Sequence, residues 1–369
     1  MKLLKNKYYT ICFINNSYKY INNFFKKKNI SKIILLIDNN IKHYCLPYIL
    51  LKLPILNKKK IINIKSGEKE KNIFNCIKIW KILEKEKIDR KSLLINIGGG
   101  VITDIGGFIS SVFKRGIRFF HIPTTLLGMV DASIGGKNGI NFESIKNEIG
   151  VFNYPDLLII DSFFLKTLPL RQIKSGLCEI LKHGLIFDKK LWFQTKKYIF
   201  KKKKYNLINL IYNSCLVKNN IVKKDPKEKN GFRKILNFGH TIGHAIESYF
   251  MNTSSILLHG EAVSIGIICE SWLSLKKGLK KNQYKDIEST FLKIIPNKMI
   301  NLCFNKIFFL IKKDKKNEHG KILFSLLKEI GNCSFNQKLK YKYIKNSIFH
   351  FKKIFLKNQN EKKRKNYKN

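Results

Sequence analysis

The sequence is short of acidic residues, proline and paired cysteines, and each shortage narrows the possibilities. It has 7 prolines and 8 cysteines in 369 residues, and no two cysteines form a CxxC pair. Cysteines scattered among apolar neighbours are typical of reduced thiols and argue against a disulfide framework. No apolar run approaches the roughly 18 residues of a membrane span. The N-terminal apolar run is short and has no small-residue cleavage site, so we expect a cytoplasmic protein without a signal peptide.

Acidic residues are so few that the charge is strongly unbalanced. Lys and Arg number 72 against 25 Asp and Glu, a formal net charge of +47. Such a balance favours a nucleic-acid partner. The excess is nearly all Lys, however, and Asn, Ile, Phe and Tyr, which also have AT-rich codons, are abundant. We attribute the charge to genomic drift, since no RNA-binding signature or zinc-finger spacing occurs. A basic nucleic-acid-binding protein stays the non-enzyme alternative.

The hydrophobic patterning changes along the chain. The first half alternates a helical pattern at residues 71–89 with buried strands at 32–40, 92–100 and 117–125, which predicts parallel βαβ units. After about residue 165 the apolar residues recur at helical spacing. We therefore expect an α/β domain over residues 1–165, an all-α domain over 166–350 and a basic, disordered tail over 351–369.

A glycine-rich turn follows the second of these strands. The stretch "INIGGGVITDIGGF" (95–108) places three glycines between a strand and a helix. Glycine lets a pyrophosphate approach the backbone, and a helix N-terminus favours an anion, although such turns also serve tight packing. Asp38 ends an earlier strand, where it could bind a ribose hydroxyl or simply form a turn. The polar loop 66–71 could line the same crevice.

Two histidines lie four residues apart in "LNFGHTIGHAIE" (236–247). Residues at this spacing share one face of a helix, so His240 and His244 could be a metal pair or a catalytic pair. Two ordinary core histidines are an equally simple interpretation. The residues by themselves leave these alternatives open.

Six stretches, in this order, resemble the 3-dehydroquinate synthase family over about residues 30–335. They are "GGGVITDIGGF", "FKRGI", "HIPTTLLGMVDASIGGKNGIN", "FLKTLPLRQIKSGLCEILKHGLI", "LNFGHTIGHAIE" and "LHGEAVSIGI". The resemblance implies a Rossmann-like, parallel-sheet NAD-binding α/β domain followed by an all-α domain, with the active site in the cleft. It also implies bound NAD, a divalent metal (zinc or cobalt) and a homodimer.

The resemblance further implies a lyase of the shikimate pathway to chorismate and the aromatic amino acids. In this family, 3-deoxy-D-arabino-heptulosonate 7-phosphate becomes 3-dehydroquinate and phosphate. The steps are transient oxidation by NAD, phosphate elimination, re-reduction and intramolecular aldol closure. The alternatives are another sugar-phosphate cyclase of the same superfamily and an NAD- and metal-dependent alcohol dehydrogenase.

Residue roles follow from the matching motifs. The implied metal ligands are Glu179, His240 and His259, while His244 would bind substrate and help to move a proton. The other implied catalytic residues are Arg115, Asp131, Lys137, Asn147, Lys182, Lys218, Arg233 and Asn237. The implied cofactor-binding residues are Asp38, Ser66, Gly67, Glu68, Lys69, Glu70, Lys71, Gly98, Gly99, Gly100, Val101, Ile102, Thr103, Asp104, Thr124, Thr125, Lys137, Lys146, Phe164, Leu165, Lys166 and Thr167.

Two residues depart from the family pattern. Asn138 follows "GGK", where a threonine is frequent, and His183 stands in "KHG", where a tyrosine is usual. Lys315 and Lys316 both match the family's C-terminal "DKK" segment, and either could bind substrate.

Overall fold

The computed structural model describes residues 2–14, 18–27, 29–143, 145–201, 206–251, 253, 255–296, 300–313 and 322–366. The chain forms two compact units, Met1–Ile173 and Lys174–Asn369. The sequence pattern predicts a boundary after residue 165, whereas this division falls inside a helix, α6 (Leu170–Phe187). Within the described ranges, no helix is both long and apolar enough to cross a membrane. Lys315 and Lys316 lie outside the described residues.

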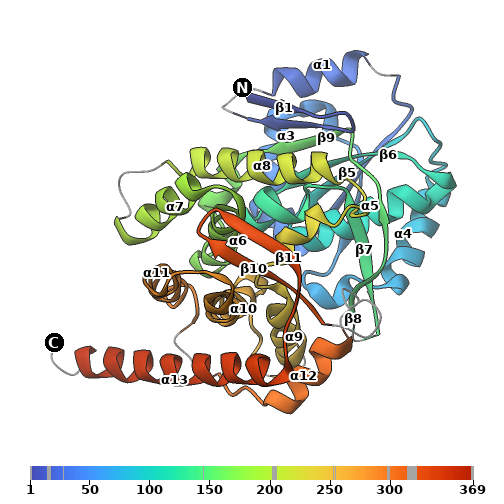
Figure 1. Ribbon diagram of the computed structural model, residues 1–369. Coiled ribbons are helices and arrows are strands. Elements are labelled where there is room, and N and C mark those ends of the chain that lie inside the picture. Colours follow the sequence, from blue (N-terminus) through green and yellow to red (C-terminus); the bar gives the residue numbers. More distant parts are fainter. Residues whose placement is uncertain are drawn as a thin grey trace. The chain divides into compact units, whose positions relative to one another are not determined.

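The first unit contains the predicted parallel sheet (Figure 1). Its strands lie in the order β1 (Lys2–Lys5), β2 (Thr10–Phe13), β9 (Leu157–Ile160), β6 (Arg118–Pro123), β5 (Leu93–Gly98), β3 (Ile33–Asp38) and β4 (Lys60–Ile64). All neighbours pair in parallel except β1 and β2, which are antiparallel. The central strands are β-branched and leucine-rich because both of their faces are covered.

The helices of this unit are α1 (Lys19–Lys27), α2 (Asn39–Tyr44), α3 (Leu46–Lys52), α4 (Ile73–Lys85) and α5 (Gly100–Val112). Buried residues of α4 and α5, among them Ile79 and Ile105, share a core with Leu36 and Leu94 of the sheet. A separate antiparallel hairpin joins β7 (Lys137–Phe142) to β8 (Ile145–Phe152). The glycine-rich turn thus connects a buried strand to a buried helix, as the sequence predicted.

The second unit is mainly helical. It contains most of α6, then α7 (Lys189–Lys201), α8 (Leu207–Lys224), α9 (His240–Phe250), α10 (His259–Ser274), α11 (Lys281–Phe291), α12 (Phe304–Lys313) and α13 (Tyr341–Asn366). One antiparallel hairpin, β10 (Leu323–Glu329) with β11 (Asn332–Lys338), adds strands where the sequence analysis expected only helices.

The predicted disordered tail is wrong for residues 351–366, which continue α13 (Figure 1). An apolar stripe at helical spacing begins before this segment and continues into its first residues. Ile344, Ile348, Phe351 and Phe355 recur at i, i+4, i+7 and i+11, and all four are buried. Burial of this stripe stabilises a helix whose composition alone suggests disorder.

Candidate functional site

Several predicted cofactor residues of the first unit lie at or just beyond one edge of its sheet. β3 ends at Asp38 and β5 at Gly98, while Ser66 follows β4, Thr124 follows β6 and Phe164 follows β9. These strands are parallel, so their carboxyl ends share one edge. In open α/β sheets, ligands bind in the crevice outside this edge. The fold therefore brings together segments that are far apart in the sequence.

The glycine loop lies in the middle of this edge. Gly99 is the N-cap of α5 and offers no side chain, so the helix N-terminus stays open to an anion. The amide of Thr124 donates to the carbonyl oxygen of Gly98 at 3.0 Å, which ties the loop to the end of β6. A Cβ on Gly98 would lie 2.6 Å from Cγ1 of Ile102, so no larger residue fits there.

A polar cluster surrounds the loop residue Lys71, which is only 3% exposed. Its ammonium contacts the carboxylate of Asp104, on α5, and the side-chain oxygen of Asn147, on β8. Lys146 lies 3.7 Å from Glu68. The structure thus joins predicted cofactor residues from the 66–71 loop, the glycine-loop helix and the hairpin.

Other predicted residues of this unit are less closely gathered. Asp38 caps α2, since its Oδ1 accepts from the amides of Asn40 and Ile41 at 2.9 and 3.1 Å. This capping explains Asp38 as a turn residue, and a contact between Asp38 and a ribose stays a prediction. Arg115 is exposed beyond the far end of the 13-residue α5. At 1.5 Å per residue, it lies about 20 Å from the glycine loop.

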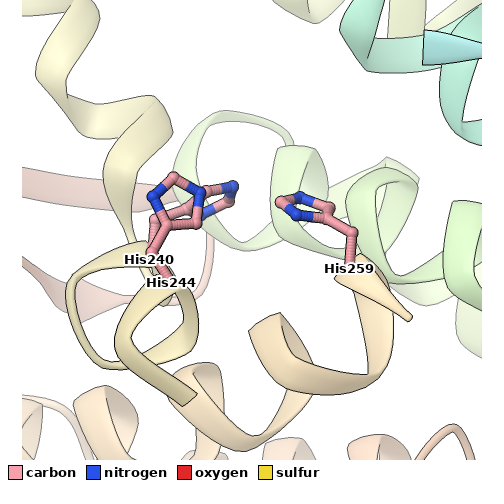
Figure 2. A group of neighbouring side chains, drawn as sticks. All are labelled: His240, His244 and His259. Carbon is pink, nitrogen blue, oxygen red and sulfur yellow. The ribbon is translucent and has the colours of Figure 1, made fainter. Parts of the chain in front are cut away.

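Three histidines converge in the second unit. Figure 2 shows His240 and His244, on α9, facing His259, the first residue of α10. Their ring centroids are 4.9 to 5.8 Å apart, and one nitrogen of each ring lies within 4.8 Å of the others. The spacing four residues apart that was noted in the sequence is therefore part of a three-histidine group.

Glu179 adds a carboxylate to this group. It lies on α6, is 0% exposed, and its Oε1 is 3.6 Å from Nε2 of His240 and 3.5 Å from Nε2 of His259. Tetrahedral bonds of about 2.0–2.1 Å to zinc put neighbouring ligand atoms about 3.3 Å apart. Both distances from Glu179 are therefore close to the spacing of two ligand atoms around one divalent ion.

The orientation of both rings supports the same fit. Nδ1 of His240 lies 3.1 Å from the carbonyl oxygen of Phe238, and Nδ1 of His259 lies 3.2 Å from Oε2 of Glu247. These oxygens accept, so each Nδ1 carries the proton and donates it. When a metal replaces any proton on Nε2, both rings are neutral and each Nε2 faces Glu179 with a free lone pair, an arrangement that a cation satisfies.

The carboxylates also dominate the protonation of His259. Burial disfavours the imidazolium, but Glu247 and Glu179 outweigh it and raise the pKa of His259 to about 10. The group thus attracts positive charge. A metal ion would take the place of that proton, because a metal ligand must be deprotonated.

A close crossing of α9 and α10 creates this geometry. A Cβ on Gly266 would lie 2.0 Å from the carbonyl oxygen of Gly239, whose φ is +78°. Glycine at both positions lets the two helices approach. Glu270 accepts from the amides of Gly239 and Ile242 at 2.7 and 3.1 Å and so fixes the start of α9.

Four basic side chains are buried among the residues that the structure describes. Exposed fractions are 3% for Lys71, 1% for Lys182, 6% for Lys218 and 2% for Arg233. Lys182 pairs with Glu179 at 2.5 Å, and Arg233 donates to the carbonyl oxygen of Pro226 at 2.9 Å. A buried cation is costly unless a partner or ligand satisfies it. Lys182, Lys218 and Arg233 had been assigned to the substrate from motif position, and Lys71 to the cofactor as part of the polar loop 66–71.

The remaining predicted residues are more accessible or have no resolved role. Asn237 and His244 are half-buried in the second unit, as Asp131 is in the first, and Lys137 is exposed. The two departures from the family pattern have partners inside the fold. Asn138 donates to the carbonyl oxygens of Gly136 and Asn153, and Nδ1 of His183 lies 2.7 Å from Oγ of Ser214.

Glu247 is the residue that sequence reasoning missed. It follows His240 by seven residues and His244 by three, so all three share one face of α9. That spacing was a usable signal. The spacing alone does not identify a partner for Glu247. The structure does, because Glu247 contacts His259 on another helix.

Comparison with known proteins gives consistent matches over the chain. The family model described as 3-dehydroquinate synthase N-terminal matches residues 61–175, and the one described as 3-dehydroquinate synthase C-terminal matches residues 176–317. The 3-dehydroquinate synthase of Parabacteroides distasonis is 39% identical over 338 residues, 91% of this chain and 95% of that protein. That of Pelagibacter ubique is 40% identical over 355 residues, 92% of this chain and 96% of that protein.

Solved structures share the fold. One is 2-epi-5-epi-valiolone synthase from Streptomyces hygroscopicus subsp. jinggangensis with NAD+ and Zn2+ bound, with a TM-score of 0.84 and 23% identity, covering 96% of this chain and 99% of that one. Another is 2-deoxy-scyllo-inosose synthase with carbaglucose-6-phosphate, NAD+ and Co2+, with a TM-score of 0.80 and 21% identity, covering 92% and 96%. From the two family models and the long, closely similar relatives, the chain belongs to the 3-dehydroquinate synthase family.

Proposed function

We propose that the protein is a 3-dehydroquinate synthase, which converts 3-deoxy-D-arabino-heptulosonate 7-phosphate to 3-dehydroquinate and phosphate. The observation that carries this proposal is the selective burial of basic side chains. In a chain with 72 Lys and Arg, those buried within the described ranges are four that are assigned to cofactor or substrate from the sequence, three of them from family motifs. A substrate with a phosphate and a carboxylate needs such cations.

The cofactor would be held at the carboxyl edge of the sheet in the first unit. The open N-terminus of α5 suits its pyrophosphate, and Lys71 with Asp104 would line the same crevice. In the second unit, Glu179, His240 and His259 would hold a divalent metal. When bound, NAD would accept and return one hydride, and the metal would polarise the hydroxyl that is oxidised.

The protein's own residues supply orientation and proton transfer. Lys182, Lys218 and Arg233 would bind the anionic groups of the substrate, because their charges are held within the fold and are directed rather than solvated. His244 lies beside the metal ligands and is half-buried, so it is suited to hydrogen-bond the substrate and carry a proton.

Other carbocycle-forming enzymes are the nearest rivals. The solved cyclases named above share the fold at 21–23% identity, whereas the synthases of P. distasonis and P. ubique reach 39–40%. This contrast favours the dehydroquinate activity. An alcohol dehydrogenase would accumulate NADH, while the synthase returns its hydride.

The deciding experiment is incubation with the heptulosonate phosphate. We expect equal amounts of phosphate and 3-dehydroquinate, with no net NADH absorbance. Phosphate release without 3-dehydroquinate would assign the chain to another cyclase. Net NADH without phosphate release would assign it to the dehydrogenases.

The family's homodimer is also part of the proposal. Arg115 is exposed and about 20 Å along α5 from the glycine loop of its own unit. Such a position suits a side chain that serves the active site of a second copy.

A further inference from the structure

Glu247 is a buried carboxylate to which no role has yet been given. It lies on α9, is 7% exposed, and its Oε2 is 3.2 Å from Nδ1 of His259, on α10. Burying a carboxylate costs free energy unless a strong partner satisfies it. The partner here is the ring of a predicted metal ligand, so the pair merits a functional explanation.

The two ring nitrogens of His259 face different carboxylates. Nδ1 faces Glu247, while Nε2 lies 3.5 Å from Oε1 of Glu179. The two nitrogens lie on separate edges of an imidazole, so Glu247 contacts the edge that faces away from the predicted metal. Glu247 is therefore placed to act on the ring and not on the ion.

Its position has two chemical consequences. A carboxylate can only accept, so it keeps the proton on Nδ1 and leaves the lone pair on Nε2, the tautomer that binds a metal. Its negative charge also makes the ring a stronger electron donor. His240 has a neutral carbonyl, that of Phe238, in the same place. The charged contact is thus a specific property of His259 within this pair.

We propose that Glu247 is a positioning residue that fixes the tautomer and orientation of His259 for a divalent metal ion. The proposal rests on the proposed function, because it takes His259 as a ligand. It extends that function by assigning the residue that prepares the ligand. Partners of this kind typically change metal affinity by about 10–100-fold when removed.

Two substitutions separate the charge from the hydrogen bond. Glu247→Gln keeps an oxygen that can accept from Nδ1 but removes the charge, and Glu247→Met removes both with similar length. Each protein is stripped of metal and titrated with Zn2+ in competition with a chromophoric chelator. We expect the Kd for Zn2+ to rise about 10-fold in Glu247→Gln and toward 100-fold in Glu247→Met. Near-normal kcat should return at saturating Zn2+.

The chain offers a matched control. Glu288, on α11, lies 3.7 Å from Nε2 of His350 and accepts from Lys285 at 2.9 Å, so it is also a glutamate beside a histidine. Glu288→Gln should leave the Kd for Zn2+ unchanged. This comparison separates a metal effect from general loss of a carboxylate–histidine contact.

The outcomes are distinguishable. A wild-type protein that binds no Zn2+ would refute the proposed metal site itself. Wild-type binding with an unchanged Kd in Glu247→Gln and Glu247→Met would overturn only the role of Glu247. If Glu247→Met does not fold, Glu247→Gln decides the question, because its size and hydrogen bonding are nearly native.

Discussion

Replacing Glu179 and His244 one at a time distinguishes the two ways of building a metal site from this cluster. The motif-derived set uses Glu179, His240 and His259, whereas a set of histidines alone would use His244 instead. Both sets are spatially possible, because Glu179 lies 3.5–3.6 Å from two ring nitrogens and all three rings converge. We expect Glu179→Gln to lose the metal and His244→Ala to keep it.

The magnitude follows from the number of ligands. Structural zinc sites with four protein ligands bind with about 10–16 kcal/mol, so one ligand contributes about 2.5–4 kcal/mol. At about 1.4 kcal/mol per tenfold, Glu179→Gln should weaken Zn2+ binding by about two to three orders of magnitude. His244→Ala should change the Kd by less than about threefold while kcat falls about 100-fold or more, the usual contribution of proton transfer.

The Glu179 variant needs a stability control. In the wild-type protein, Oε2 of Glu179 lies 2.5 Å from Nζ of Lys182, and both residues are buried. Removing one partner of a buried ion pair costs about 3–5 kcal/mol. Glu179→Gln combined with Lys182→Met removes both charges, so it should recover much of that stability while the metal site stays weak.

The assay measures zinc stoichiometry by plasma emission and Kd by chelator competition, with thermal unfolding of the metal-free proteins in parallel. His240→Ala and His259→Ala should behave like Glu179→Gln. The reasoning is refuted if His244→Ala loses zinc while Glu179→Gln retains it. That result would favour the three-histidine site.

Four further predictions concern the rest of the molecule. Arg233→Lys should lower kcat/KM about 100-fold because Lys cannot form a bidentate fork; unchanged steady-state kinetics would remove Arg233 from the site. Exhaustive removal of NAD from its expected site at Gly98–Asp104 should abolish turnover, and full activity without NAD would contradict that site. Burial lowers the pKa of His121 to about 3. In the unfolded state the pKa of His121 is near 6.5. Between pH 6.5 and about 3, therefore, only the unfolded state takes up this proton, and the free energy of unfolding falls as the pH drops below 6.5. The free energy of unfolding measured with urea should be about 3 kcal/mol lower at pH 4.5 than at neutral pH, and the decrease should be smaller in His121→Gln. Equal decreases in the two proteins would exclude His121 as the cause. Monomers should be less active because Arg115 is expected to serve the partner, and full activity of monomers in sedimentation-controlled assays at nanomolar concentration would contradict this.

Elements whose signals are local could be predicted from the order of the residues. A β-branched run followed by glycines predicted β5, its turn and α5, because strand and helix periodicity depend on neighbouring residues. The order of the motifs indicated the family and the ligand set. The prediction of a disordered tail was wrong for residues 351–366, because it relied on composition and overlooked the apolar stripe that begins earlier in α13 and is buried.

Which of many similar side chains are buried or brought together depends on how distant segments pack in the folded protein. Lysine is so frequent here that spacing alone cannot separate Lys182 and Lys218 from the surface lysines, whereas the folded structure buries both. Likewise, nothing local links Glu247 to His259, which lies on the next helix. Periodicity records how each residue relates to its neighbours along the chain, but a binding site requires contacts between segments distant in sequence, and these form only when the helices pack.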